Sequence, residues 1–244
     1  MREKLIALSI VKKGNWGEIY QVLRNDKKLH TIDEYASYEL IKQLDCDMLT
    51  LMDDEYPLAW REMRKPPFVV FYKGDIELLK SKAVSVIGGK VKSSYTSKAI
   101  SNLMRALPRD INVISGLEIG VEAYSISHAS IKIAVIASGF IATKQPTQQV
   151  DLILSELPPN VKFNLSAYYR SYHLIHELSD IVCVFELPSF DLRLKYLAYL
   201  TEIGKEVVVA PDVFKKSTSG GLGLINHGAK LMLGSKDIVK LLVG

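Results

Sequence analysis

Hydrophobic residues in the later part of the chain gather in short runs that are rich in Val and Ile and alternate little with polar residues. Runs of this kind predict strands buried on both faces, as in parallel sheets, and the segments between several of them are long enough for crossover helices. The pattern predicts an α/β fold, a doubly wound and mostly parallel sheet with helices on both faces. The runs are FVVFY (68–72), AVSVIG (83–88), INVISG (111–116), IAVIASG (133–139), IVCVFEL (181–187) and EVVVAP (206–211).

The first 52 residues have a different pattern, in which apolar positions approximate helical spacing. Leu5 and Leu8, Ile19 and Leu23, and Leu40 and Leu44 are such pairs. The change to short β-rich runs follows the sequence DDEYP at 53–57. We therefore expect a small helical domain at 1–52 and the sheet domain at 53–244.

Glycine follows three of the predicted strands, in Gly88-Gly89, Ser115-Gly116 and Ser138-Gly139. In open α/β sheets ligands bind outside the carboxyl ends of the strands, and glycine lets the backbone turn tightly and approach a ligand there. A helix is expected from about Ser94, and the free N–H groups of its first turn favour an anion.

The net charge of +4 is modest, but its distribution is uneven. Between Leu78 and Arg109 there are seven Lys or Arg residues and no Asp or Glu. Lys90 and Lys92 directly follow the Gly88-Gly89 pair, which favours a phosphate ligand, either of a nucleotide or of a nucleic-acid backbone. A tight structural turn with solvated lysines is the equally open alternative.

Several kinds of site are not indicated. The chain lacks G-x-G-x-x-G, G-x-x-x-x-G-K-[ST] and G-x-S-x-G, so no cofactor and no catalytic residue is predicted. His173 and His176 have helical i, i+3 spacing but no third ligand, so no metal site is predicted. Cys183 lies in an apolar run and should be a buried thiol. Apolar runs are too short to span a membrane, and the start does not resemble a signal peptide, so we expect a cytoplasmic protein with no membrane partner.

The order of several segments resembles the DNA-processing protein A family (DprA/Smf) over about residues 53–244. This resemblance implies an extended Rossmann-like fold and a non-catalytic protein that binds single-stranded DNA. It also implies a homodimer that protects incoming DNA and helps to load the RecA recombinase onto it during natural transformation. The segments are PPFVVFYKGDIELL (66–79), VSVIGGK (84–90), SGLEIGVEA (115–123), IAVIASG (133–139), SELPP (155–159), GKEVVVAP (204–211) and LINHGAKLM (224–232).

The resemblance also suggests site residues. Gly88, Gly89 and Lys90 occupy the family's Gly-Ser-Arg turn that faces a phosphate, and Ser115 and Gly116 match its Ser-Gly-Leu-Ala segment. Lys92 joins this expected nucleic-acid-binding set through its charge.

The family's Phe-Pro-x-Arg-Asn-Arg stretch falls on Tyr168 to His173, which keeps Arg170 and brings in three tyrosines. Tyr168, Arg170 and His173 are therefore also expected to bind nucleic acid, with bases stacked on tyrosine. An amphipathic helix whose tyrosines pack partly in the core is the equally weighted interpretation.

The chain departs from the family pattern around the expected pocket. Lysine replaces arginine at Lys90, Ile119 stands where a basic residue is common, and Glu122 replaces an aspartate. The sequence DLRLKYL (191–197) replaces a small-residue segment, and Leu222 replaces an asparagine in SGGLGLI (219–225), which we interpret as a glycine-rich loop.

These departures leave two alternatives to DNA binding. One is a phosphate- or nucleotide-binding enzyme that hydrolyses nucleoside monophosphates with Glu118, Glu122 and Glu156. The other is a scaffold that has lost DNA binding and keeps its protein contacts.

Overall fold

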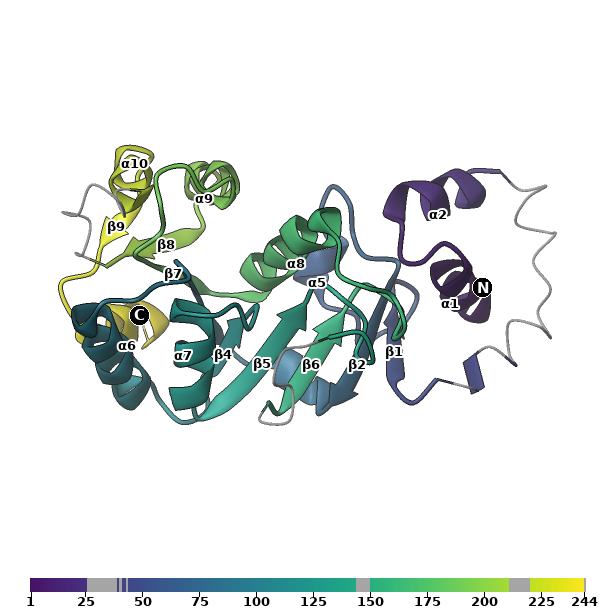
Figure 1. The fold of residues 1–244 in the computed structure, drawn as a ribbon, viewed down its shortest axis with the longest axis horizontal. Helices are drawn as coiled ribbons and strands as arrows, with labels where there is room; N and C mark the ends of the chain where they lie inside the picture. Colours follow the sequence, from purple (N-terminus) through teal and green to yellow (C-terminus); the bar gives the residue numbers. More distant parts are fainter. Residues whose placement is uncertain (26–38, 40, 43, 144–149, 211–219, 244) are drawn as a thin grey trace. The chain divides into compact units, whose positions relative to one another are not determined.

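The computed structural model describes residues 1–25, 39, 41–42, 44–143, 150–210 and 220–243 (Figure 1). Its described strands form a mostly parallel sheet of nine strands in the order β1-β2-β6-β5-β4-β3-β7-β8-β9, which confirms the expected α/β fold class. The chain divides into two compact units. Unit 1 comprises Met1–Ile76, Ile136–Lys144 and Ile153–Ser171, and unit 2 comprises Glu77–Val135, Gln145–Leu152 and Tyr172–Gly244.

Unit 2 is built on parallel strands that the Val/Ile runs predicted. They are β3 (Ala83–Gly88), β4 (Asn112–Ser115), β5 (Ile131–Ile136), β7 (Ile181–Phe185) and β8 (Glu206–Val209), with the short β9 (Lys230–Leu231) beyond β8. Every residue of β3 is buried, and β3 pairs with β4 on one side and β7 on the other. From β3 the chain adds strands in one direction through β4 and β5, and from β7 in the other through β8. The switch point of the sheet therefore lies between β3 and β7.

The helices of unit 2 include α6 (Ser94–Ala106), α7 (Val121–His128), α9 (Arg193–Glu202), α10 (Gly220–Asn226) and α11 (Ser235–Val243), together with most of the 3₁₀ helix η1 (Ile76–Lys80). Helix α6 begins at Ser94, as the sequence suggested, because the Ser93 hydroxyl accepts a hydrogen bond from Thr96 N at 3.1 Å. It buries Ile100, Leu103 and Met104 and ends before Leu107, whose extended backbone is the one favoured ahead of a proline.

Unit 1 contains α1 (Arg2–Val11), α2 (Trp16–Leu23), β1 (Asp47–Thr50), α5 (Leu58–Arg61), β2 (Val69–Gly74) and β6 (Leu152–Ser155). The two N-terminal helices match the predicted helical spacing. Strands β1 and β2 pair antiparallel, and α1 contacts both. One apolar cluster joins helices and strands: Leu5, Ile6, Leu8, Ile19, Phe68, Val69 and Phe71. The N-terminal helices therefore share a core with the first strands.

Helix α8 (Leu165–Leu178) follows β6 and confirms that the tyrosine-rich stretch is helical. The interpretation of SGGLGLI (219–225) as a loop was wrong. Most of SGGLGLI is helical, because α10 begins at Gly220. The domain boundary expected near residue 53 stays a prediction.

Cys183 is buried as predicted, and burial raises the pKa of its thiol to about 12. Within the described residues no helix is long and apolar enough to cross a membrane.

Candidate nucleic-acid interface

The turn after β3 lies at the switch point of the sheet and is packed too closely for side chains. A Cβ on Gly88 would collide with the Phe185 carbonyl oxygen and with Val121, and a Cβ on Gly89 would lie 2.6 Å from the Glu186 carbonyl oxygen. The Gly89 carbonyl accepts a hydrogen bond from Val121 N at 3.1 Å, which joins this turn to the segment after β4. We call residues 88–95 and 116–120 of unit 2 the glycine-rich rim.

The start of α6 is already supplied with acceptors from within the protein. Glu186, which is buried, accepts a hydrogen bond from Ser93 N at 2.7 Å, and the Ser93 hydroxyl accepts the one from Thr96 N. A carboxylate at a helix N-terminus satisfies its free N–H groups and its dipole. An external anion at this turn therefore depends mainly on lysine side chains.

Lys90 is exposed and Lys92 half-buried, and Lys92 Nζ lies 4.3 Å from the centre of the Tyr124 ring. Three apolar or aromatic side chains of the rim are also exposed: Val91 (84%), Tyr95 (54%) and Ile119 (79%). The rim thus presents cations beside apolar groups, a combination that suits phosphates with attached bases.

Ser115 and Gly116 have internal roles. The Ser115 hydroxyl donates to the Val86 carbonyl oxygen at 2.9 Å and is buried. A Cβ on Gly116 would lie 2.8 Å from Glu122 Oε2 and 3.2 Å from the Tyr172 hydroxyl. Gly116 therefore makes room for a buried polar network behind the rim.

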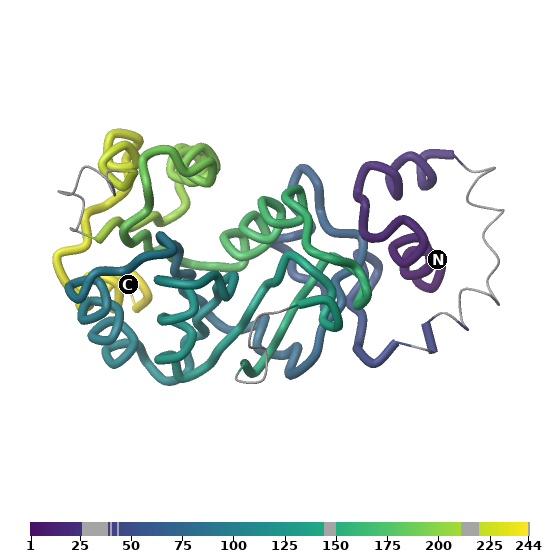
Figure 2. Tube along the Cα trace, in the orientation of Figure 1, coloured from purple at the N-terminus to yellow at the C-terminus, as the bar shows by residue number. Residues whose placement is uncertain are grey.

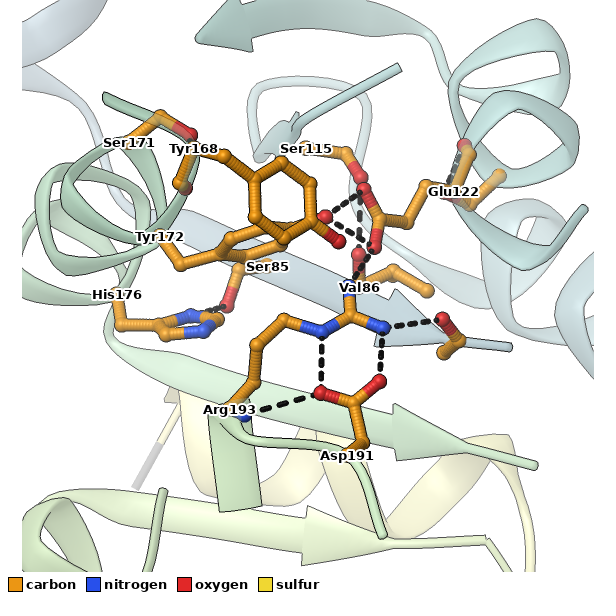
Figure 3. A network of polar contacts seen from close by, with 12 residues as sticks. Ser85, Val86, Ser115, Glu122, Tyr168, Ser171, Tyr172, His176, Asp191 and Arg193 are labelled. Carbon is orange, nitrogen blue, oxygen red and sulfur yellow. Dashed lines mark hydrogen bonds and ion pairs between the residues drawn. The ribbon is translucent and has the colours of Figure 1, made fainter. Parts of the chain in front are cut away.

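Arg193 stands at the centre of that network (Figure 3). Its guanidinium donates to Glu122 Oε1 at 2.8 Å, to Asp191 Oδ1 at 2.9 Å and Oδ2 at 2.8 Å, and to the Gly88 carbonyl oxygen at 3.1 Å. The Tyr172 hydroxyl donates to Glu122, and its ring lies under the guanidinium, 4.7 Å from centre to Cζ. Arg193 is 6% exposed and Glu122 is 1% exposed. A guanidinium of the protein itself therefore contacts the inner side of the glycine turn.

Burial perturbs the titration of two groups here. It raises the pKa of Glu122 to about 7, against the opposing effects of Arg193 and Tyr172. It lowers the pKa of His176 to about 3, with the nearby His173, Arg193 and Lys205 acting in the same direction. His176 is therefore neutral at pH 7, and its Nδ1 lies 3.2 Å from the Ser85 hydroxyl.

The expected residues of α8 fall in different environments. In unit 1, Arg170 pairs with Glu156, and both of its donating nitrogens reach that carboxylate. Tyr168 is half-buried, with its ring 5.9 Å from Phe163 and 5.3 Å from Tyr169, centre to centre. In unit 2, His173 stacks on Tyr196 at 3.7 Å between ring centres.

The structure therefore brings together Gly88, Gly89, Lys90, Lys92, Ser115 and Gly116 in unit 2, with His173 elsewhere in that unit on α8. Tyr168 and Arg170 belong to unit 1. Among the described residues no group of three or more His, Cys, Asp or Glu side chains is arranged to hold a metal ion.

Sequence reasoning missed the partnership of Glu122, Asp191 and Arg193. It recorded Glu122 and the segment 191–197 as separate departures from a family pattern. A signal for it was the Asp-x-Arg spacing of Asp191 and Arg193 soon after the predicted strand 181–187.

The chain is similar to known proteins over most of its length. Residues 47–243 match the family of DNA recombination-mediator protein A. The DNA processing protein DprA of Bacillus subtilis is 30% identical over 78% of this chain and 69% of that protein, and DprA of Streptococcus pneumoniae is 28% identical over 78% and 72%.

Two solved structures share the fold. The X-ray structure of S. pneumoniae DprA has a TM-score of 0.79 at 23% identity and covers 98% of this chain and 93% of that one. A Helicobacter pylori DprA structure, described for its single-stranded DNA binding mode, has a TM-score of 0.71 at 19% identity over 82% and 97%. The family match and the sequence relatives together establish that this chain belongs to the DNA recombination-mediator protein A (DprA/Smf) family.

Proposed function

We propose that this protein binds single-stranded DNA and takes part in DNA processing during natural transformation, without a catalytic activity of its own. The single observation that carries the proposal is the glycine-rich rim, where Lys90 and Lys92 stand beside exposed apolar side chains at the switch point of the sheet. Family membership and the named binding mode of the H. pylori relative support it.

In the proposed complex the lysines of the rim pair with phosphates, and Val91, Tyr95 and Ile119 contact bases or sugars. Because Arg193 already donates to the inner side of the glycine turn, the DNA strand lies on the outer surface of the rim. Ser115 and Gly116 then act by supporting the turn, and His173, also of unit 2, provides a further contact with the DNA. Tyr168 and Arg170 of unit 1 are proposed as separate contacts with nucleic acid. Stacking on a tyrosine contributes roughly 1–3 kcal/mol per base.

The family also suggests finer features, which we propose with it: a homodimer in the cytoplasm that protects incoming DNA and helps to load the RecA recombinase. A test of the last step is the rate at which RecA forms filaments on single-stranded DNA covered by single-strand binding protein. Acceleration by this protein, lost in a variant that no longer binds DNA, supports the step. An unchanged rate refutes it.

Fluorescence anisotropy of a labelled oligo-dT, titrated with the protein at several salt concentrations, tests DNA binding. We expect log–log salt dependence with a slope of about 0.7 for each phosphate neutralised. The double variant Lys90→Ala/Lys92→Ala should bind more weakly and lower the slope by about 1.4. The matched control is Lys236→Ala/Lys240→Ala, which removes the same charge from exposed positions of α11.

Equal weakening by the two double variants would show a general charge effect and refute the rim as the binding surface. No binding at low salt would refute DNA binding itself and favour a scaffold. Release of free base from a nucleoside monophosphate would instead favour the hydrolase. That enzyme has little support in the geometry, because Glu122 is engaged by Arg193 and Glu156 by Arg170.

A further inference from the structure

Unit 1 holds a cavity of about 410 Å³, which is within the range of roughly 300–1,000 Å³ that small-molecule sites have. One wall is the turn between α1 and α2, from Lys12 to Glu18, which Figure 2 traces in purple. The opposite wall is the segment between β6 and the first turns of α8, including Asn164 and Arg170.

The charges on these walls favour an anion. Lys12, Lys13 and Arg170 line the cavity together with Glu18 and Glu156. Glu156 is occupied by Arg170, and Glu18 lies 3.5 Å from Lys12 Nζ. Lys13 has no ion-pair partner within the described part of the chain, so one cationic side chain is left to neutralise a ligand.

Backbone donors add to this charge. Helix α2, of eight residues, and α8, of 14 residues, both begin at the cavity wall. Asn15 and Asn164 cap them, accepting hydrogen bonds from Glu18 N at 3.2 Å and Ala167 N at 2.8 Å. Other N–H groups of each first turn have no carbonyl partner within the helix. The dipole of α2 is partly offset by Glu18 in its first turn, which Lys12 in turn pairs with at 3.5 Å. Gly17 lines the cavity with backbone atoms alone.

We propose that this cavity binds a phosphate monoester, either a free mononucleotide or the terminal phosphate of a DNA strand. The phosphate lies against Lys13 and the first turn of α2. The attached sugar fills the remaining volume beside Leu157 and Val161, which also line the cavity. The proposal goes beyond the DNA-binding function, because every wall residue belongs to unit 1 whereas the glycine-rich rim belongs to unit 2.

The chain carries its own reporter for this site. Trp16 lines the cavity, and Trp60, the other of two tryptophans, is fully buried. Trp16 is stacked on Tyr20 and Phe68 at 4.9 and 5.2 Å between ring centres. Its faces are therefore packed, and a ligand changes its surroundings at the edge that borders the cavity. Binding should alter the emission of Trp16, and Trp16→Phe removes this signal and leaves calorimetry as the readout.

The experiment titrates the full chain with thymidine 5′-monophosphate, thymidine and inorganic phosphate, followed by tryptophan fluorescence and calorimetry. Lys13→Glu reverses the unpaired charge. Gly17→Asp places a carboxylate in the first turn of α2, where a Cβ meets only Asn15 Oδ1 at 3.6 Å and an acidic residue favours the helix. Lys42→Glu, outside the cavity lining, is the control for net charge.

We expect saturable binding of the monophosphate, no binding of thymidine, and binding of inorganic phosphate at least roughly tenfold weaker. Lys13→Glu and Gly17→Asp should each weaken binding by about tenfold or more, and Lys42→Glu by less than about twofold. No saturable binding of the monophosphate overturns the proposal. Unchanged affinity in Lys13→Glu and Gly17→Asp also overturns it, and equal affinity for inorganic phosphate overturns the assignment to a monoester.

Two further measurements distinguish strand ends from free nucleotides as the ligand, and the cavity from the glycine-rich rim. Tighter binding of 5′-phosphorylated than of 5′-hydroxyl oligo-dT, abolished by Lys13→Glu, assigns the site to strand ends, and equal binding of the two assigns it to free nucleotides. Lys90→Ala/Lys92→Ala should leave the affinity for the monophosphate unchanged. Failure of the rim and failure of this cavity are therefore distinguishable, because each has its own variants and its own probe.

Discussion

Replacing Arg193 with leucine should destabilise the protein strongly and make its stability depend on pH. The guanidinium donates to Glu122, to both oxygens of Asp191 and to the Gly88 carbonyl oxygen, at 2.8–3.1 Å. Removing one partner of a buried ion pair costs roughly 3–5 kcal/mol, because the other charge is left without compensation. Asp191 is partly exposed and can be hydrated, so most of the cost comes from Glu122.

The sign of the pH effect follows from Glu122. Its pKa in the folded protein, about 7, is already above the value of 4.5 for a free carboxyl, and without Arg193 it rises further. At pH 5 the carboxyl of the variant is protonated in the folded state, and only hydrogen bonds are lost, at about 1–2 kcal/mol. Above pH 7 the folded variant must retain a proton that the unfolded chain releases. The loss of unfolding free energy relative to the wild type should then grow by up to about 1.4 kcal/mol per pH unit, until the pH reaches the pKa of Glu122 in the folded variant.

Urea denaturation followed by circular dichroism at pH 5, 6, 7 and 8 measures both effects. Arg105→Leu is the matched control, since Arg105 is an exposed arginine of α6 that donates to Asn102 and to the Ser101 carbonyl oxygen. We expect that control to cost below about 0.5 kcal/mol. The double variant Arg193→Leu/Glu122→Gln should lose the pH dependence. A cost for Arg193→Leu below about 1 kcal/mol at pH 8, or one that does not rise with pH, would refute the reasoning.

Two further changes test the surroundings of this network. His176 has a folded pKa of about 3, below the 6.5 of free histidine, so its contribution to stability is present above pH 6.5 and is lost as the pH falls towards 3. In His176→Asn, the free energy of unfolding should therefore fall less steeply with acidification than in the wild type, with slopes that differ by up to about 1.4 kcal/mol per pH unit. Equal slopes of the free energy of unfolding against pH in the two proteins would contradict this. Gly116→Ala should lower the free energy of unfolding by about 1–3 kcal/mol, because its Cβ would lie 2.8 Å from Glu122 Oε2. Gly223→Ala in α10 is the control, since its Cβ would enter open space, and this change should be neutral or stabilising. Thermal unfolding compares the two, and equal effects would contradict the packing argument.

The fold was predictable because the central strands obey a simple rule. Strands β3 and β7 are buried on both faces, and their sequences AVSVIG and IVCVF show this directly. Strands β1 and β6 were missed because their sequences, DMLT and LILS, are not runs of Val and Ile like those of the predicted strands. The first helices were predicted from their apolar spacing, but only the structure shows that their apolar faces pack on β1 and β2.

The candidate site was predictable only where its chemistry is local in sequence. The Gly88-Gly89-Lys90 turn follows a strand directly and needs no knowledge of distant residues. The polar network does need it, since Arg193 and Glu122 are 71 positions apart and the closed geometry around Gly116 depends on Tyr172 as well. Sequence reasoning also did not anticipate that Glu186, with a left-handed backbone, supplies an acceptor to the start of α6.

The departures from the family pattern take on a different meaning once these contacts are known. Glu122 in place of an aspartate, and Asp191 and Arg193 in place of small residues, look in sequence like separate losses at a binding pocket. In the structure they bind one another, with Arg193 between the two carboxylates. A buried arginine without Glu122 or Asp191 would leave a charge without compensation, so each of these residues makes the others tolerable. Together these residues support the glycine turn from within, and in the proposed complex the rim binds its ligand through Lys90 and Lys92 although the small residues are gone.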